Sequence, residues 1–139
     1  MKLEKKVSFE AAHRLMDHEG ECRFLHGHSY QCKILISSSY IPEDGMIIDL
    51  GMIESYIKNK FDHCLLLNRN DLLSEAIDMT QAKIRVFDKD PTIETLAEKI
   101  ARDINEMLIG IDYITVVLSE TQNNRVKFTF FSEVDDIPN

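Results

Sequence analysis

The segment Cys22-Arg23-Phe24-Leu25-His26-Gly27-His28-Ser29-Tyr30 places two histidines one residue apart at the start of an apolar strand pattern. In a strand, residues i and i+2 point to the same face, about 7 Å apart. His26 and His28 can therefore converge on one metal ion, while Gly27 leaves the opposite face clear and lets the backbone bend. The same spacing occurs in solvent-exposed strands, so the rest of the chain must decide between a metal pair and two surface histidines.

Two long strands are predicted around this segment. Residues 2–9 alternate, with Leu3, Val7 and Phe9 on one face and mostly charged residues on the other. Residues 26–39 alternate in the same way from Tyr30 onward. We expect these strands to pair antiparallel. The polar connection between them is too long for a tight hairpin, and we expect it to carry function.

The remaining elements follow in a simple order. Residues 42–45 predict a turn, and the apolar spacing over residues 52–61 predicts a helix. Residues 65–83 show no clear period, and residues 84–87 suggest a short strand. Asp90, Pro91 and Thr92 open the clearest helix, which Gly110 ends. Strands are expected over 114–120 and 126–131, and the acidic tail 133–139 is expected to fray. This order predicts an α+β fold, a four-stranded antiparallel sheet with two helices on one face.

Size and composition restrict the function. The 139 residues predict one domain spanning 1–139, large enough to fold without disulfides. A net charge of -8 argues against nucleic acid or an anionic membrane as a partner. Charges stand where a signal peptide would need an apolar run, and no stretch approaches the roughly 18 apolar residues of a membrane span. Three cysteines without framework spacing indicate a reducing cytosol, and we expect Cys32 and Cys64 to be packed thiols.

His13 is the natural third ligand, because pairing of the two strands brings the beginning and the end of their connection together. Three histidines with an open fourth position form a catalytic zinc site. The alternative is that His13 is a packed histidine. Cys22 lies in the same connection and is compatible with two roles, a base activated beside a cation or a fourth ligand that closes the site. His18 is expected to be a solvated loop residue.

Two further carboxylates are candidates for chemistry. Asp62 and His63 are adjacent after a predicted helix, a pattern typical of a proton relay and also of a surface ion pair. Glu120 ends a very apolar strand, where a carboxylate is costly without a partner. Two N–H groups on the edge of a heterocycle would match its two oxygens, although Glu120 could equally emerge into solvent.

Together these residues resemble a known family, 6-pyruvoyltetrahydropterin synthase, which includes 6-carboxytetrahydropterin synthase of the queuosine pathway. The resemblance spans residues 7–121 and is carried by six short motifs in order: Phe9-Glu10-Ala11-Ala12-His13, Cys22-x-x-x-His26-Gly27-His28, Gly45-Met46-Ile47-Ile48-Asp49, Phe61-Asp62-His63, Pro91-Thr92-x-Glu94 and Glu120-Thr121. It implies a tunnelling fold whose trimers form a barrel, with two trimers stacked into a hexamer, in a cytoplasmic protein.

The resemblance also implies roles for the site residues. Zinc would be held by three histidines, His13, His26 and His28. Cys22 would be the catalytic base, working with Asp62 and His63 from a neighbouring subunit. Glu120 would anchor the pterin through its amino-pyrimidine edge. The substrate would be 7,8-dihydroneopterin triphosphate, and no redox cofactor would be needed.

The spacing from Cys22 to His28, with Leu25 before the first histidine, looks most like the 6-carboxy branch, whose members also release acetaldehyde and triphosphate. Three features depart from the family pattern. Thr95 stands where the family often has asparagine, and Gln122 to Arg125 differ from the usual residues. The segment 68–90 is also longer than in compact members. These departures leave three alternatives: a 6-pyruvoyl enzyme, an enzyme that cleaves the dihydroneopterin side chain, and a non-catalytic pterin-binding protein.

Overall fold

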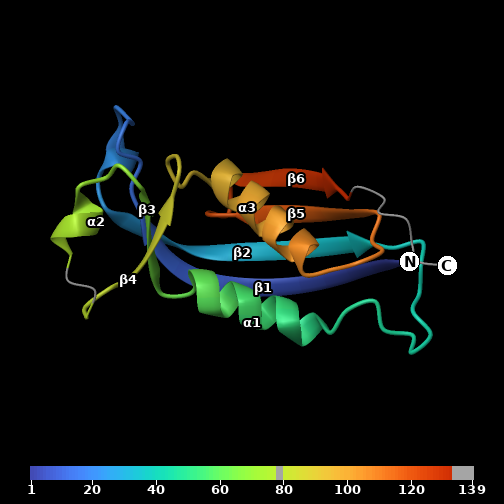
Figure 1. Cartoon of the computed structure of the whole chain (residues 1–139). Helices are drawn as coiled ribbons and strands as arrows, with labels where there is room; N and C mark the ends of the chain where they lie inside the picture. The colour runs from blue at the N-terminus through green and yellow to red at the C-terminus, as the bar shows by residue number, and fades with distance from the viewer. Residues whose placement is uncertain (78–79, 133–139) are drawn as a thin grey trace.

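A computed structural model describes residues 1–77 and 80–132, which form one sheet covered by helices (Figure 1). The predicted fraying of the tail 133–139 lies outside the described residues. The sheet has six strands in the order β4-β3-β1-β2-β5-β6. The strands are β1 (Lys2–His13), β2 (His26–Ser37), β3 (Cys64–Asn68), β4 (Lys83–Phe87), β5 (Tyr113–Ser119) and β6 (Arg125–Phe131). The helices are α1 (Leu50–Phe61), α2 (Leu73–Ala76) and α3 (Ile93–Glu106), and a 3₁₀ turn, η1, spans Glu21–Arg23.

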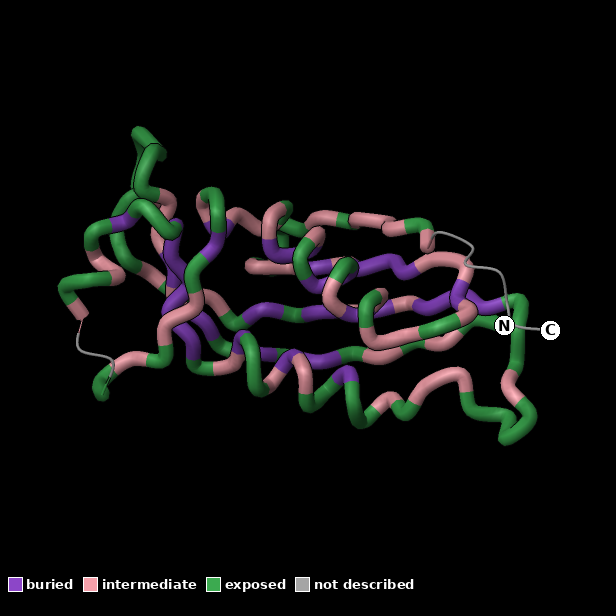
Figure 2. Tube along the Cα trace, in the orientation of Figure 1, coloured by how far each residue is buried: buried purple, intermediate pink, exposed green. Residues whose placement is uncertain are grey.

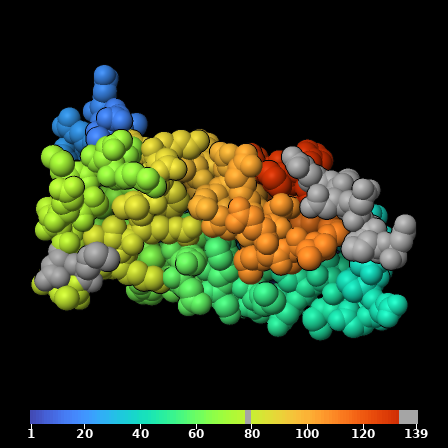
Figure 3. All heavy atoms as spheres, viewed as in Figure 1, coloured from blue at the N-terminus to red at the C-terminus, as the bar shows by residue number. Residues whose placement is uncertain are grey.

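The β1–β2 hairpin is the backbone of the sheet. Its two strands pair antiparallel along their full length, from Lys2 opposite Ser37 to His13 opposite His26. The predicted pairing is therefore confirmed, and both strands are bounded differently from the expectation, since β1 continues to His13 and β2 ends at Ser37. The connection between them projects from the end of the molecule farthest from the N-terminus (Figures 1 and 3).

The prediction of a four-stranded antiparallel sheet is wrong, because β3 and β4 extend the sheet on one side. β3 pairs parallel with β1, and β4 pairs parallel with β3. All five residues of β3 are buried, so its sequence lacks the alternation of a half-exposed strand. The prediction of residues 84–87 as a strand is confirmed by β4. In the single chain the sheet is open, with β4 and β6 at its edges.

Two main helices cover the same face of the sheet, as predicted, and the short α2 is an addition to the expected pair. α1 packs on β1, and α3 packs on β5 and β6 (Figure 1). Side chains of Asp49 and Thr92 cap the two helices, accepting hydrogen bonds from Gly51 N and Thr95 N. α3 ends at Glu106, and Gly110 instead takes a positive φ of 72° in the following turn.

One apolar core lies between the helices and the sheet (Figure 2). Phe9 stacks on Tyr30 with 4.9 Å between ring centroids, and Phe61 from α1 lies 5.5 Å from Phe9. Cys32 and Cys64 are buried in this core as expected. Within residues 1–77 and 80–132, none of the helices has the length and apolar character needed to cross a membrane.

Candidate metal centre and its surroundings

Three histidines converge at the end of the β1–β2 hairpin. His13 is opposite His26, and His28 is opposite Ala11, so the register brings all three rings to the helix-covered side, in phase with Phe9 and Tyr30. The ring centroids are 4.6 to 5.2 Å apart. One ligand atom from each ring lies within 4.8 Å of the others, which forms a candidate metal site.

The hydrogen bonds of two rings fix which nitrogen faces this cluster. The Nδ1 of His13 lies 2.9 Å from the carbonyl oxygen of Pro91, and the Nδ1 of His26 lies 2.7 Å from that of Phe24. A carbonyl oxygen only accepts hydrogen bonds, so each Nδ1 carries the hydrogen. Each neutral ring therefore presents a lone pair on Nε2, the arrangement in which a backbone carbonyl orients a metal-ligating histidine.

The residues present fit a divalent cation. The Nε2 atoms of His13 and His26 face each other at 3.1 Å, where two lone pairs repel unless a proton or a cation lies between them. Ligands at the usual zinc–nitrogen distance around a tetrahedral ion would be about 3.4 Å apart. Burial lowers the pKa of His13 to about 4, and the bond to Pro91 offsets only part of this effect. His13 is thus neutral at neutral pH, and neutral imidazoles are suited to zinc.

Tyr30 forms the floor beside this cluster. Its ring centroid lies 5.6 Å from that of His28 and 6.2 Å from that of His13. Burial, followed by the charge of Glu120, raises the pKa of its phenol well above the ordinary value, so the hydroxyl stays neutral. Sequence reasoning missed Tyr30, although its position two residues after His28 places it on the same face.

Cys22 lies on η1 in the connection between the hairpin strands. Its carbonyl oxygen accepts a hydrogen bond of 2.9 Å from the N–H of Leu15, which ties η1 back to the end of β1. The thiol is half-buried. Among the described residues, the cluster of potential ligands contains the three histidines and not Cys22. The geometry therefore gives no support to Cys22 as a fourth ligand. His18 is exposed and accepts a hydrogen bond from Gly20 within the same loop.

Glu120 follows β5 on the side of the sheet that carries His28. Ser119 pairs with Gln31, so Glu120 comes next to Tyr30 and continues the buried row that includes Leu118. Its charge partly offsets the lowering of the pKa of His28 by burial. Glu120 and His28 both border a hollow of about 610 Å³ between the start of β2 and the end of β5. In the part of the chain that the structure describes, no hydrogen bond or ion pair occupies the Glu120 carboxylate, which leaves it available to a ligand.

Asp62 and His63 form a pair that is separate from the histidine cluster. Asp62 accepts a hydrogen bond of 2.9 Å from the N–H of Glu10, and its other oxygen lies 3.1 Å from Nδ1 of His63. The bond from Glu10 is the main cause that lowers the pKa of Asp62, and the bond from His63 adds to it. The His63 side chain is 79% exposed. Within one chain, the described ligand cluster does not include this imidazole.

A small α+β protein whose long hairpin ends in three converging histidines is a candidate metalloprotein with an open, solvent-accessible centre. The chain belongs to the 6-pyruvoyl tetrahydropterin synthase family, because the sequence model of that family matches residues 2–130. The resemblance predicted from the motifs is thereby confirmed.

Individual relatives agree with this assignment. The chain is 34% identical over 132 residues to a 6-carboxy-5,6,7,8-tetrahydropterin synthase of Rickettsia typhi, covering 88% of this chain and 96% of the relative. It is 31% identical, with the same coverage, to the Rickettsia felis protein of the same name. The fold is similar to that of Plasmodium falciparum 6-pyruvoyl tetrahydropterin synthase, with a TM-score of 0.70 and 19% identity over 94% of this chain and 99% of the other.

Proposed function

We propose that this protein is a zinc-dependent lyase that converts 7,8-dihydroneopterin triphosphate to 6-carboxy-5,6,7,8-tetrahydropterin, with release of acetaldehyde and triphosphate. The observation that carries the proposal is the pair of carbonyl-bound rings, whose Nε2 atoms face each other beside His28. The names of the curated relatives support the 6-carboxy branch. Its product class would place the reaction in queuosine or 7-deazapurine biosynthesis.

Each side chain has a role that follows from its surroundings. Zinc, held by His13, His26 and His28, would supply a Lewis acid for the hydroxyl oxygens of the substrate side chain. Glu120 would accept two N–H groups from the amino-pyrimidine edge and so orient the ring. Cys22, outside the ligand cluster, would move protons between carbon and oxygen.

The Asp62–His63 pair would complete a neighbouring subunit's site in a homo-oligomer, a trimer or a hexamer whose open sheets close into a barrel. The exposure of His63 and its absence from the described ligand cluster of its own chain support this arrangement. Mixing a Cys22→Ala protein with a His63→Ala protein is expected to restore part of the activity in hybrid assemblies. Continued inactivity after verified subunit exchange would place the whole site within one chain.

Product analysis tests the reaction itself. Purified zinc-loaded protein is incubated with 7,8-dihydroneopterin triphosphate, and the products are identified by mass spectrometry. We expect a 6-carboxy product with acetaldehyde, and almost none with Cys22→Ala. A 6-pyruvoyl or a 6-hydroxymethyl product would assign the protein to another branch of the family. Tight pterin binding without any turnover would instead indicate a non-catalytic binding protein.

A further inference from the structure

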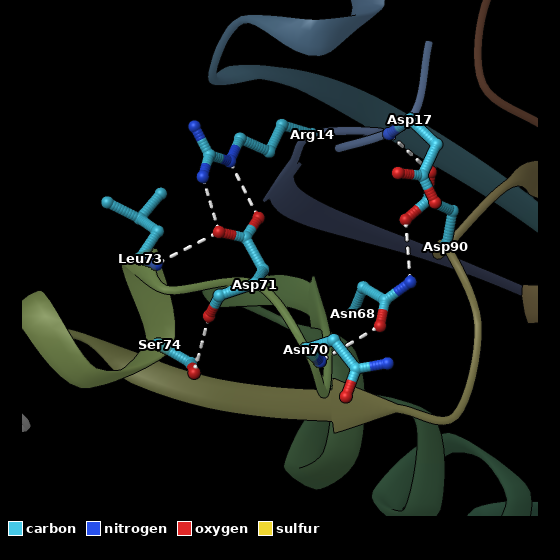
Figure 4. A network of polar contacts seen from close by, with 8 residues as sticks. All are labelled: Arg14, Asp17, Asn68, Asn70, Asp71, Leu73, Ser74 and Asp90. Carbon is cyan, nitrogen blue, oxygen red and sulfur yellow. Dashed lines mark hydrogen bonds and ion pairs between the residues drawn. The ribbon is translucent and has the colours of Figure 1, made fainter.

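A network of polar side chains links the end of β3 and the turn after it to Arg14 and to the turn before α3 (Figure 4). We propose that Asn68 is a positioning residue for this centre, because through Asp90 it holds the Pro91 carbonyl that orients His13. The inference rests on the proposed metal-binding function. It assigns to the end of β3, within the segment 68–90 that the family resemblance left without a role, the task of fixing a ligand on β1.

His13 depends on a contact from a distant part of the chain. The ring is 2% exposed, and its Nδ1 is 2.9 Å from the carbonyl oxygen of Pro91, which is 78 residues away in sequence. This contact sets both the tautomer and the rotation of the ring, so that Nε2 faces the other histidines. A shift of the Pro91 peptide would therefore change the direction of a ligand lone pair.

Asp90 anchors the peptide that carries this carbonyl. Its Oδ1 accepts a hydrogen bond of 2.9 Å from the side-chain amide of Asn68. Its own carbonyl oxygen accepts a bond of 2.8 Å from the N–H of Thr92, the residue that caps α3. Pro91 is thus held between a helix cap on one side and Asn68 on the other, and its ring restricts the backbone further.

Asn68 is itself fixed relative to β1. It is 6% exposed at the end of β3, and β3 is in register with β1 through Leu66 opposite His13. Its Oδ1 accepts a hydrogen bond of 3.0 Å from Asn70 N, so its NH₂ group must face the Asp90 carboxylate. The amide therefore links the strand beside His13 to the turn that contacts the His13 ring.

A second contact, from the turn after β3, holds the residue after His13. Arg14 binds both oxygens of Asp71, whose side chain is completely buried. Asp71 Oδ1 also accepts a hydrogen bond of 2.9 Å from the N–H of Leu73 (Figure 4). The turn after β3 is thus attached to the end of β1 by an ion pair and to the Pro91 turn by Asn68.

The position of Asn68 favours this role over simple packing. It follows Leu65, Leu66 and Leu67 in a strand that is buried throughout. A buried polar side chain contributes less to stability than an apolar one unless its hydrogen bonds are satisfied. Here both ends of the amide are used, one for the local turn and one for the anchor of Pro91, so the amide specifies a geometry that leucine could not.

The test measures zinc affinity by chelator competition and the visible spectrum of the cobalt-substituted protein, with thermal unfolding of the metal-free protein as a check on folding. Loss of a contact that orients a metal ligand weakens metal binding by about 10- to 100-fold. Asn68 acts one step further from the ligand, through Asp90 and the Pro91 carbonyl, so for Asn68→Ala we expect a loss at the lower end of that range, about 10-fold, and a changed cobalt spectrum. The matched control is Asn70→Ala, an exposed neighbour whose backbone N–H, which bonds Asn68, is retained; it should bind zinc like the wild type.

A double-variant comparison tests the route through Asp90. Asp90→Ala also removes the 3.4 Å contact from the N–H of Asp17, so it should weaken zinc binding at least as much as Asn68→Ala. The Asn68→Ala, Asp90→Ala double variant should be no weaker than Asp90→Ala alone. Asp90→Asn keeps an acceptor oxygen and should retain most of the affinity. If Asn68→Ala does not fold, the half-buried Asp90 provides the test by itself.

The outcomes separate this inference from the proposed function. A wild-type protein that binds no zinc would overturn both. Zinc binding by the wild type with unchanged affinity and cobalt spectrum in Asn68→Ala and Asp90→Ala would overturn the positioning role alone. Additive losses in the double variant would also overturn it, because they would show that the two residues act independently.

Discussion

Because His13 is buried, we expect the stability of the metal-free protein to fall in acid. Its pKa falls from 6.5 to about 4 on folding, chiefly through burial. Between these values the unfolded state binds the proton more tightly, so the free energy of unfolding decreases as pH falls. At 1.36 kcal/mol per pKa unit, the full effect is about 3 kcal/mol. By the same linkage relation, about 2 kcal/mol of this is lost between pH 7 and pH 5.

Urea unfolding of the chelator-treated protein measures this loss, with His13→Phe as the comparison. Between pH 7 and pH 5 the wild type should lose about 2 kcal/mol more than His13→Phe, because the phenylalanine ring does not titrate. His28, whose pKa burial also lowers, remains in both proteins and cancels in the difference. Aspartates whose pKa is lowered from the ordinary value of 3.8, such as Asp62, change the free energy of unfolding mainly at lower pH, outside this pH range. Parallel stability curves for the two proteins would refute the reasoning.

Other perturbations test the centre, its ligand contacts and the core separately. His26→Ala should abolish stoichiometric zinc, whereas His18→Ala, in an exposed loop, should retain it; equal metal content in both variants by atomic absorption would contradict the assignment. Glu120→Gln should weaken pterin binding by about 10- to 100-fold in calorimetry while zinc content stays unchanged, since a charged hydrogen-bond acceptor is lost. Tyr56→Phe removes a 2.6 Å hydrogen bond to Asp103 and should lower the free energy of unfolding by about 1–2 kcal/mol in urea titrations, with no change in zinc affinity.

The parts of the fold that could be predicted are those whose apolar residues recur at a regular spacing in the sequence. The β1–β2 hairpin and α3 each bury one face, so apolar residues recur in their sequences at regular intervals. β3 buries both faces and has no such interval, so it is absent from the predicted sheet. β4 is predicted as a strand, but it pairs with β3 and has no place in a sheet from which β3 is missing. The parallel pairing of β3 with β1 depends on the path of the chain through α1, and no local pattern encodes it.

The site, too, has a part that the sequence predicts and a part that it does not. Side-chain spacing was sufficient to select His13, His26 and His28, which the hairpin register then brings together. The groups that orient two of these rings are the carbonyl oxygens of Phe24 and Pro91, and backbone atoms leave no residue-type signal. Asn68 had no detectable pattern either, because its partner Asp90 is 22 residues away and beyond a strand.

The backbone conformation of His63 bears on the proposal that this residue completes a neighbouring subunit's site. Its φ of 57° lies in the left-handed region, which costs a non-glycine residue about 1–3 kcal/mol unless its surroundings impose it. Two hydrogen bonds with the backbone of Glu10 impose it, one from His63 N at 2.6 Å and one to the Asp62 carboxylate. β1 therefore holds the Asp62–His63 pair rigidly while the imidazole stays exposed. The imidazole is thereby held in an exposed position, as the proposed role in a neighbouring subunit's site would require.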